Sequence, residues 1–239
     1  MKYSKALKYD STYYRSLFMG PNPVKLEEEL LLDCKIPQGA KVMDLGCGRG
    51  VTSVFLVKEC GFRVWAVDLW CEAEENGRFF AGEGLTPAQI TPVHADTTKG
   101  LPFEREFFDA VVSVDSYHYF GRDPHYLDAR LLPCVKSGGL LYLAVPGMKK
   151  DLHDALPPEL LLSWTADDLD YIHDARYWAD MVGRSHDAEV LSVREMESNE
   201  ECWQDWLKCD NEYARGDRAT MEAGGGRYMN FLSIVLRKK

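Results

Sequence analysis

The sequence contains no apolar run that approaches the ~20 residues needed to span a membrane, and its amino terminus has no apolar stretch of signal length. Its seven cysteines are an odd number and include no C-x-x-C pair, which argues against a disulfide framework and a zinc site. None of the six histidines has metal-ligand spacing with acidic or cysteine partners, so we expect no metal. We therefore expect a cytoplasmic protein with free thiols and no membrane partner.

Basic residues are also in short supply. The chain has 28 Lys and Arg against 38 Asp and Glu, which gives a formal net charge of -10 and no basic cluster. Because nucleic-acid ligands call for a basic face, we expect no nucleic-acid partner. Hydrophobic residues make up 46% of the 239 residues, enough for one large α/β core of ordinary composition.

The most informative feature is a glycine-rich turn that follows an apolar strand. Residues 41–45 lead into Gly46-Cys47-Gly48-Arg49-Gly50, the strand, turn and helix junction at which open α/β sheets hold an adenosine-type cofactor. A dinucleotide fingerprint would place its third glycine at Val51. The carboxylate of Asp44, just before the turn, would also repel a pyrophosphate. A cationic ligand therefore fits the motif better than a nicotinamide dinucleotide.

Acidic residues follow three further apolar strands in the same way. Segments 63–68, 90–95 and 110–114 read as strands that end at Asp68, Asp96 and Asp115. The carboxyl ends of parallel strands share one edge of a sheet, so these side chains should converge with Asp44 on one crevice. Asp68 occupies the position whose carboxylate binds a ribose diol in units of this kind.

This ordered set of motifs resembles the class I S-adenosylmethionine-dependent methyltransferases over about residues 41–146. The glycine turn fits the first motif of the family, Asp68 the second, and Asp96 with Thr97 the third. Segments 107–113 and 135–140 fit the approaches to the fourth and fifth strands, although the proline usual near Ser137 is absent. The resemblance implies an α/β fold with a doubly wound, mostly parallel, seven-stranded sheet and S-adenosyl-L-methionine as cofactor, whose ammonium, ribose diol, adenine amine and sulfonium suit clustered carboxylates.

What the resemblance implies for the site is a set of donor-binding residues along the crevice. The expected contacts with S-adenosyl-L-methionine are Asp44, Gly46, Cys47, Gly48, Asp68, Leu69, Asp96, Thr97 and Asp115. Simpler interpretations stay open, because a glycine-rich turn can be only a tight turn and an aspartate at a strand end can be only a helix cap. In the family, the position of Asp115 often contributes mainly its backbone.

The stretch 116–120 follows the fourth strand and should face the transferred methyl group. His118 is the candidate general base, since the pKa of histidine lies near neutrality, with a place in the pocket wall as the alternative. Aromatic side chains that could enclose an acceptor, or else pack in the core or at the domain edge, are Tyr14, Trp70, Tyr117, Tyr119 and Trp164.

The rest of the chain is expected to complete one domain. Residues 1–40 read as a helical lid, 41–147 as the cofactor-binding core, and 148–239 as an insertion with the last strands of the same sheet. Helical spacing and breakers predict helices over 24–34, 50–60, 72–83, 123–133, 177–182 and 200–213, and strands over 140–145, 189–193 and 228–236.

The function that these features favour is transfer of a methyl group to a small-molecule acceptor, most simply at nitrogen or oxygen. The residues that follow the fourth strand are Asp115-Ser116-Tyr117-His118. They differ from the Asn-Pro-Pro-aromatic signature, which would have indicated a resemblance to the methyltransferases that act on amino groups of nucleic-acid bases. A protein or peptide methyltransferase, a non-catalytic S-adenosylmethionine-binding module and, with least support, an NAD-dependent oxidoreductase stay as alternatives. The sequence leaves the acceptor and the oligomeric state open.

Overall fold

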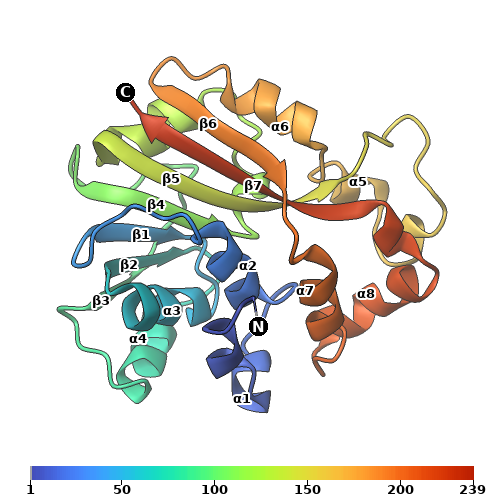
Figure 1. Cartoon of the computed structure of the whole chain (residues 1–239), viewed down its shortest axis with the longest axis horizontal. Helices are drawn as coiled ribbons and strands as arrows, with labels where there is room; N and C mark the ends of the chain where they lie inside the picture. Colours follow the sequence, from blue (N-terminus) through green and yellow to red (C-terminus); the bar gives the residue numbers. More distant parts are fainter. Residues whose placement is uncertain (1) are drawn as a thin grey trace.

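A seven-stranded sheet with helices on both faces organises the chain, which a computed structural model describes over residues 2–239 (Figure 1). The strand order is β3-β2-β1-β4-β5-β7-β6. All neighbouring pairs from β3 to β5 are parallel, and β7 is antiparallel to both β5 and β6. The predicted mostly parallel, doubly wound sheet is confirmed. The strands are β1 (Lys41–Leu45), β2 (Arg63–Asp68), β3 (Ile90–His94), β4 (Phe108–Val114), β5 (Val135–Met148), β6 (Ala188–Glu195) and β7 (Met229–Lys238).

The central strands are buried on both faces, as their near-continuous apolar runs predict for parallel sheets. Successive residues of β1 point to opposite sides, so Val42 packs in one core layer and Met43 in the other. The strand order reverses between β1 and β4. In open α/β sheets, this point leaves a crevice at the carboxyl ends of the strands, which is where ligands bind.

Helices cover the two faces of the sheet in separate layers (Figure 1). One layer contains α2 (Pro23–Leu30), α3 (Val51–Cys60) and α4 (Ala73–Gly82), and the other contains α6 (Ala175–Val182) with the short turns over 127–134. Gly50 and Gly61 flank α3 with φ values of 78° and 72°, a left-handed conformation that glycine adopts without steric cost. The predicted helix over 50–60 is thus confirmed with its start and stop signals.

Short helices connect and extend this framework. At the amino terminus lie a 3-10 turn (Ala6–Tyr9) and α1 (Thr12–Arg15); beyond the fifth strand lie α5 (Ala166–Leu169), α7 (Asn199–Trp206) and α8 (Glu212–Glu222). Further 3-10 turns span Tyr117–Tyr119, Leu160–Leu162 and Gly225–Arg227. Among residues 2–239, no helix has the length and apolar character required to cross a membrane.

Two predicted helices differ from the structure. The single helix over 200–213 is wrong, because α7 ends at Trp206 and Asn211 starts a separate helix, its side chain accepting a hydrogen bond from the amide of Ala214. The helix over 123–133 is instead a π-helical turn, Leu127–Leu131, followed by a 3-10 turn. Pro133 lies in that second turn and supplies no amide hydrogen to an α-helix.

Candidate functional site

A cavity of about 660 Å³ lies at the carboxyl ends of β1, β2 and β4, where the strand order reverses. Its volume is in the range of small-molecule sites. We distinguish two parts of its wall. The glycine-loop side comprises Gly46, Cys47, Gly48, Asp68, Asp96 and Thr97, and the aromatic side comprises Asp115, Tyr119, Phe120, Tyr171 and Tyr213. Leu69 and Trp70 lie on the wall as well, together with Leu17, Met19, Gly20 and Pro23 of the amino-terminal segment. The other lining residues are Arg49, Val51, Thr52, Val67, Thr98, Val114 and Ser116.

Close approaches on the glycine-loop side explain why glycine stands at two positions. Gly46 has a φ of 76°, and a Cβ there would lie 1.8 Å from the Oγ of Ser116. Gly48 has a φ of 52°, and a Cβ there would lie 2.9 Å from the Sδ of Met19. Any other residue would be strained and would push the loop away from β4 or from the amino-terminal segment.

Asp68 is held by backbone amides around the turn after β2. Its Oδ2 accepts a hydrogen bond from the amide of Gly48 at 2.8 Å, and its Oδ1 accepts from the amides of Trp70 and Cys71 at 2.7 and 2.9 Å. A carboxylate has about four lone-pair positions, so it can accept from a ligand hydroxyl in addition. The contacts therefore fix the carboxylate at the cavity wall and tie β2 to the glycine loop.

Asp96 is also bonded within the protein. Its Oδ1 accepts from the hydroxyl and the amide of Thr98 at 2.6 and 3.0 Å, and its Oδ2 lies 3.0 Å from the ammonium of Lys99. The hydroxyl of Thr98, followed by Lys99, lowers the pKa of Asp96 to about 2. The cavity wall therefore carries an ionised carboxylate at this position.

Asp44 does not line the cavity. It is buried behind the glycine loop, where its Oδ2 accepts hydrogen bonds from the hydroxyls of Thr52 and Ser53 at 2.7 and 2.6 Å. Its Oδ1 has no partner among residues 2–239. Burial raises the pKa of Asp44 to about 6, although the two hydroxyls oppose the shift. The contacts anchor β1 to the first turn of α3, and direct contact with a cofactor stays a prediction.

Asp115 on the aromatic side differs from the other carboxylates. It has a φ of 56°, a left-handed conformation that costs a non-glycine residue about 1–3 kcal/mol and is concentrated at functional sites. A Cβ on Gly20 would lie 2.1 Å from its Oδ2, so the amino-terminal segment passes directly over the carboxylate. Burial, and then the negative charge of Asp217, raise the pKa of Asp115 to about 8.

A series of aromatic rings continues from Asp115 to the mouth of the cavity. The ring of Tyr119 lies 5.2 Å from Trp70 and 5.5 Å from Tyr171. The guanidinium of Arg122 stacks 4.1 Å from the ring of Tyr171 and donates to a carboxylate oxygen of Asp170 at 2.7 Å. Trp70 is 65% exposed and therefore marks the opening. These contacts join the turn after β2 to the insertion beyond β5.

Three of the predicted acceptor contacts lie outside the cavity wall. The hydroxyl of Tyr14 donates to Glu83 at 2.8 Å, Tyr117 is buried in the core, and the indole of Trp164 donates to Asp217 at 2.9 Å. Of the predicted aromatic contacts, Trp70 and Tyr119 do line the cavity. A contact of the other three with an acceptor stays a prediction.

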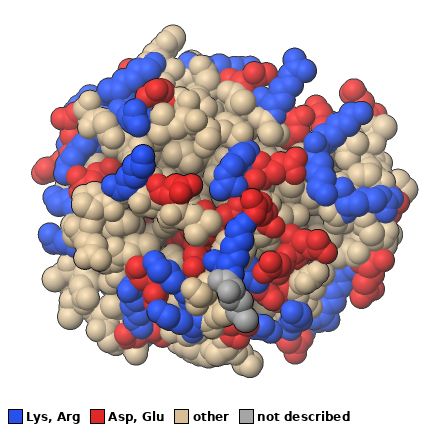
Figure 2. All heavy atoms as spheres, in the orientation of Figure 1, with Lys and Arg blue, Asp and Glu red and all other residues tan. Residues whose placement is uncertain are grey.

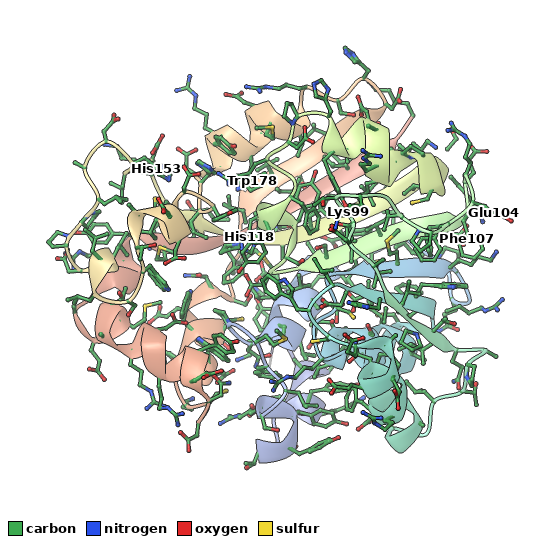
Figure 3. All side chains as sticks on the ribbon, turned by 180° about the vertical axis from the view of Figure 1, so that it is seen from behind. Lys99, Glu104, Phe107, His118, His153 and Trp178 are labelled. Carbon is green, nitrogen blue, oxygen red and sulfur yellow. The ribbon has the colours of Figure 1, made fainter. Side chains whose placement is uncertain are left out.

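His118 is buried near the middle of the molecule and does not line the cavity (Figure 3). Its Nδ1 has no hydrogen-bond partner among residues 2–239. Burial, and then the positive charge of Arg122, lower the pKa of His118 to about 3. Because such a ring is neutral at neutral pH and binds a proton weakly, the geometry does not support its predicted role as general base.

Sequence reasoning missed several residues of the cavity wall. Met19 and Gly20 lie in the predicted lid over 1–40 but were not named as site residues, and Tyr213 had been placed at the end of a helix. The two prolines of the stretch 19–23 mark its sharp path and were the available signal. Tyr171 has no local signal, because only the tertiary fold brings the insertion to β4.

With this geometry established, comparison with known proteins identifies the domain. Residues 42–139 match a family model described as a methyltransferase domain. Over these residues the chain is similar to methyltransferase domains. The matched segment runs from β1 to the turn within β5 and includes the glycine-loop side, Asp115 and Tyr119.

Individual relatives differ in the reactions that their names state. A 2-methyl-6-phytyl-1,4-hydroquinone methyltransferase of Synechocystis sp. is 33% identical over 115 residues, which are 46% of this chain and only 33% of the relative. A Haemonchus contortus phosphoethanolamine N-methyltransferase in complex with S-adenosyl-L-methionine aligns with a TM-score of 0.72 at 17% identity, over 99% of this chain and 57% of that one. The [4+2]-cyclase SpnF aligns with a TM-score of 0.69 at 14% identity, over 100% of this chain and 96% of that one. These structural similarities establish the fold.

Proposed function

We propose that this protein binds S-adenosyl-L-methionine along the glycine-loop side and transfers its methyl group to a small-molecule acceptor on the aromatic side. The observation that carries the proposal is one cavity at the reversal of strand order, in which a glycine loop, Asp68 and Asp96 meet a separate aromatic wall. When bound, S-adenosyl-L-methionine would supply an electrophilic methyl group on a sulfonium.

The residues of the glycine-loop side fit this cofactor. Asp68 is oriented by three amides and keeps capacity to accept from the ribose hydroxyls. Asp96 is ionised and suits the adenine amine. The ionisable residues of the wall are Asp68, Asp96, Asp115 and Arg49, and the guanidinium of Arg49 donates to the carbonyl of Ser16 at 3.0 Å. The raised pKa of Asp115 leaves two carboxylates against one guanidinium when no ligand is bound. A net negative wall favours a cationic ligand and disfavours a pyrophosphate.

The amino-terminal segment fits the role of a cover that excludes water. On one side, the contact from Arg49 to Ser16 ties it to the glycine loop. On the other, the amide of Asn22 donates to the carbonyl of Cys202 at 3.2 Å, and its side chain donates to Asp205 at 3.0 Å. Much of the acceleration in a group transfer can come from holding donor and acceptor in register away from water.

A covered cavity favours a small molecule over a protein or peptide acceptor. The face in Figure 2 carries Lys and Arg interspersed with Asp and Glu, without a continuous basic patch that would suit a nucleic acid. The reaction itself has to be measured, because the neighbours of this fold include a protein named as a cyclase.

Calorimetry tests the donor site. S-Adenosyl-L-methionine and S-adenosylhomocysteine should bind, whereas NAD⁺ should give no heat. Asp68→Ala should lower the affinity for S-adenosylhomocysteine at least about tenfold. The substitution removes the acceptor for the ribose diol and leaves three backbone amides without their hydrogen-bond partner. Asp167→Ala is the matched control, since Asp167 is exposed in the first turn of α5. NAD⁺ binding, or equal affinity in both variants, would contradict the assignment.

Methyl-labelled donor and a metabolite extract test the transfer. Label should move into the small-molecule fraction with release of S-adenosylhomocysteine. Label in the protein fraction would instead favour a protein or peptide substrate. Donor binding with no transfer to either fraction would favour a binding module.

A further inference from the structure

We propose that the acceptor is an amine and that the carboxylate of Asp115 binds its nitrogen and accepts its proton, an inference that rests on the methyl transfer proposed above. The carboxylate lies on the cavity wall at the end of β4, next to the glycine loop. This position separates it from Asp68 and Asp96, which belong to the ends of β2 and β3.

The first argument is that Asp115 lacks a counter-charge. Among residues 2–239, its carboxylate makes no hydrogen bond or ion pair, whereas Asp68 and Asp96 are each bonded to donors of the protein. A second carboxylate, Asp217, lies close enough to raise the pKa of Asp115 further. The nearby carboxylate and the burial both disfavour the ionised form of Asp115, and a cation bound in the cavity beside Asp115 would favour it.

Asp217 is itself fixed in position by two indoles and cannot turn away. Its Oδ1 accepts from Trp164 at 2.9 Å and its Oδ2 accepts from Trp206 at 2.8 Å. Arg122, whose guanidinium stacks on Tyr171, is paired with Asp170 and does not line the cavity. The carboxyl group of Asp115 is therefore available to a ligand rather than to the protein, and a bound ammonium would favour its ionised form.

The second argument is the set of rings around this carboxylate. Tyr119 and Tyr213 line the same cavity, and no guanidinium within residues 2–239 stacks on their rings, unlike that of Tyr171. Aromatic faces attract ammonium groups, by about 0.5–2 kcal/mol depending on how far water is excluded. A carboxylate with aromatic walls is suited to a protonated nitrogen, whereas a phosphate would be repelled by Asp115.

The step balances without another reactant. The bound ammonium gives one proton to the carboxylate of Asp115, which frees the lone pair of nitrogen. This pair forms the nitrogen–carbon bond as the carbon–sulfur bond breaks, and the electrons of that bond stay on sulfur, which becomes a neutral thioether. The methylated nitrogen leaves as an ammonium, and Asp115 releases its proton to water. A carboxylate with a raised pKa accepts a proton more readily than an ordinary one.

Asp115→Asn tests the assignment on the full-length protein. With methyl-labelled donor and a metabolite extract, the labelled product of the wild-type protein should bind a cation exchanger at acidic pH, as a methylated amine does. Asp115→Asn should lower its rate of formation at least about 100-fold, the size expected for a lost proton acceptor. Affinity for S-adenosylhomocysteine should stay within about twofold, and Asp167→Asn should behave as wild type.

The outcomes separate the two proposals. A labelled product that passes the exchanger would overturn the amine assignment and leave methyl transfer intact. Equal loss of S-adenosylhomocysteine affinity and of rate in Asp115→Asn would mean that Asp115 binds the ammonium of the donor, and would also overturn it. Failure of the wild-type protein to bind S-adenosylhomocysteine would instead defeat the proposed function.

A measurement that needs no variant uses two probes of the same shape. Choline and its uncharged analogue 3,3-dimethylbutan-1-ol are titrated into protein saturated with S-adenosylhomocysteine. Choline should bind at least about tenfold more tightly, as an aromatic wall with an unpaired carboxylate implies. Equal binding of the two probes would overturn the proposal.

Discussion

The carboxylates on the two sides of the cavity differ in their hydrogen bonding. On the glycine-loop side, Asp68 is bonded to three backbone amides and Asp96 to Thr98 and Lys99. On the aromatic side, Asp115 has no bonded partner within residues 2–239 and occupies a left-handed backbone conformation. The first arrangement is pre-organised by donors of the protein, and the second keeps a carboxyl group available for a ligand.

Because of this difference, substitutions on the two sides of the cavity should change different measured properties. Residues on the glycine-loop side should affect binding of the donor, and residues on the aromatic side should affect turnover with donor binding preserved. Outside the cavity, a carboxylate that accepts hydrogen bonds should stabilise the fold. A buried carboxylate without hydrogen-bond donors should destabilise the fold once it is ionised.

The largest effect is expected for Gly46→Ala, which adds a methyl group 1.8 Å from the Oγ of Ser116 at a φ of 76°. We expect a loss of at least about 100-fold in S-adenosylhomocysteine affinity, because the loop must move away from β4. Gly84→Ala is a matched control, with a φ of 75° and no atom within 4 Å of the added carbon. It should cost about 1 kcal/mol of stability and leave affinity unchanged.

A second substitution distinguishes the clash from the backbone strain. Adding Ser116→Gly to Gly46→Ala removes the Oγ and the Cβ that the new methyl group would meet, and leaves the Cα at 3.8 Å. Affinity should then recover in part, as measured by calorimetry. If Gly84→Ala weakened binding as much as Gly46→Ala, or the double variant recovered nothing, close approach to β4 would not be the reason for this glycine.

The glycine-loop side could be predicted because its determinants are local. The apolar strand, the glycine turn and the aspartate at the end of β2 lie within the 28 residues from Lys41 to Asp68, and each follows from its neighbours along the chain. Burial of the central strands and the ends of α3 followed from apolar runs and flanking glycines in the same way.

The aromatic side could not be predicted to the same degree, because four distant segments build it. Asp115, Tyr171 and Tyr213 line one cavity with Gly20 of the amino-terminal segment, and these four residues come together only in the folded chain. Sequence reasoning therefore chose His118 for its chemistry, whereas the turn over 117–119 directs that ring into the core. Proximity along the chain indicated the right segment but not which of its side chains faces the cavity.

Glu29→Gln should produce the next largest effect. This buried glutamate accepts from the guanidinium of Arg194 at 2.8 Å and from the amides of Glu197 and Ser198 at 2.9 and 2.7 Å. Burial opposes its ionisation, but these contacts lower the pKa of Glu29 overall, so its stabilisation is present above about pH 4.5 and lost as pH falls through the lowered value. We expect urea unfolding at pH 7 to show a loss of about 1–3 kcal/mol. An unchanged midpoint would refute the structural role.

Tyr119→Ala should have a moderate effect confined to the aromatic side. Removing the ring beside Asp115 should lower kcat/KM for the acceptor about tenfold, which corresponds to about 1.4 kcal/mol of lost interaction. Affinity for S-adenosylhomocysteine should not change, and Tyr119→Phe should retain most of the rate because the aromatic face remains. Tyr14→Phe is the control outside the cavity. A loss of S-adenosylhomocysteine affinity in Tyr119→Ala would contradict the division of the cavity into two sides.

Glu27→Gln should have the smallest effect at neutral pH. Both carboxylate oxygens of Glu27 are buried without a partner among residues 2–239, and burial, followed by the charge of Asp44, raises the pKa of Glu27 well above 4.5. A raised folded-state pKa means that stability is fully present below about pH 4.5 and is lost as pH rises through the folded value. The protonated side chain resembles glutamine, so the two proteins should unfold alike below the raised pKa of Glu27, and the variant should become the more stable one as pH rises through it. Urea unfolding at a series of pH values measures the difference in stability between the variant and the wild-type protein. If the variant became less stable relative to the wild-type protein as pH rose, Glu27 would be ionised and bonded in solution, like Glu29 on the same helix.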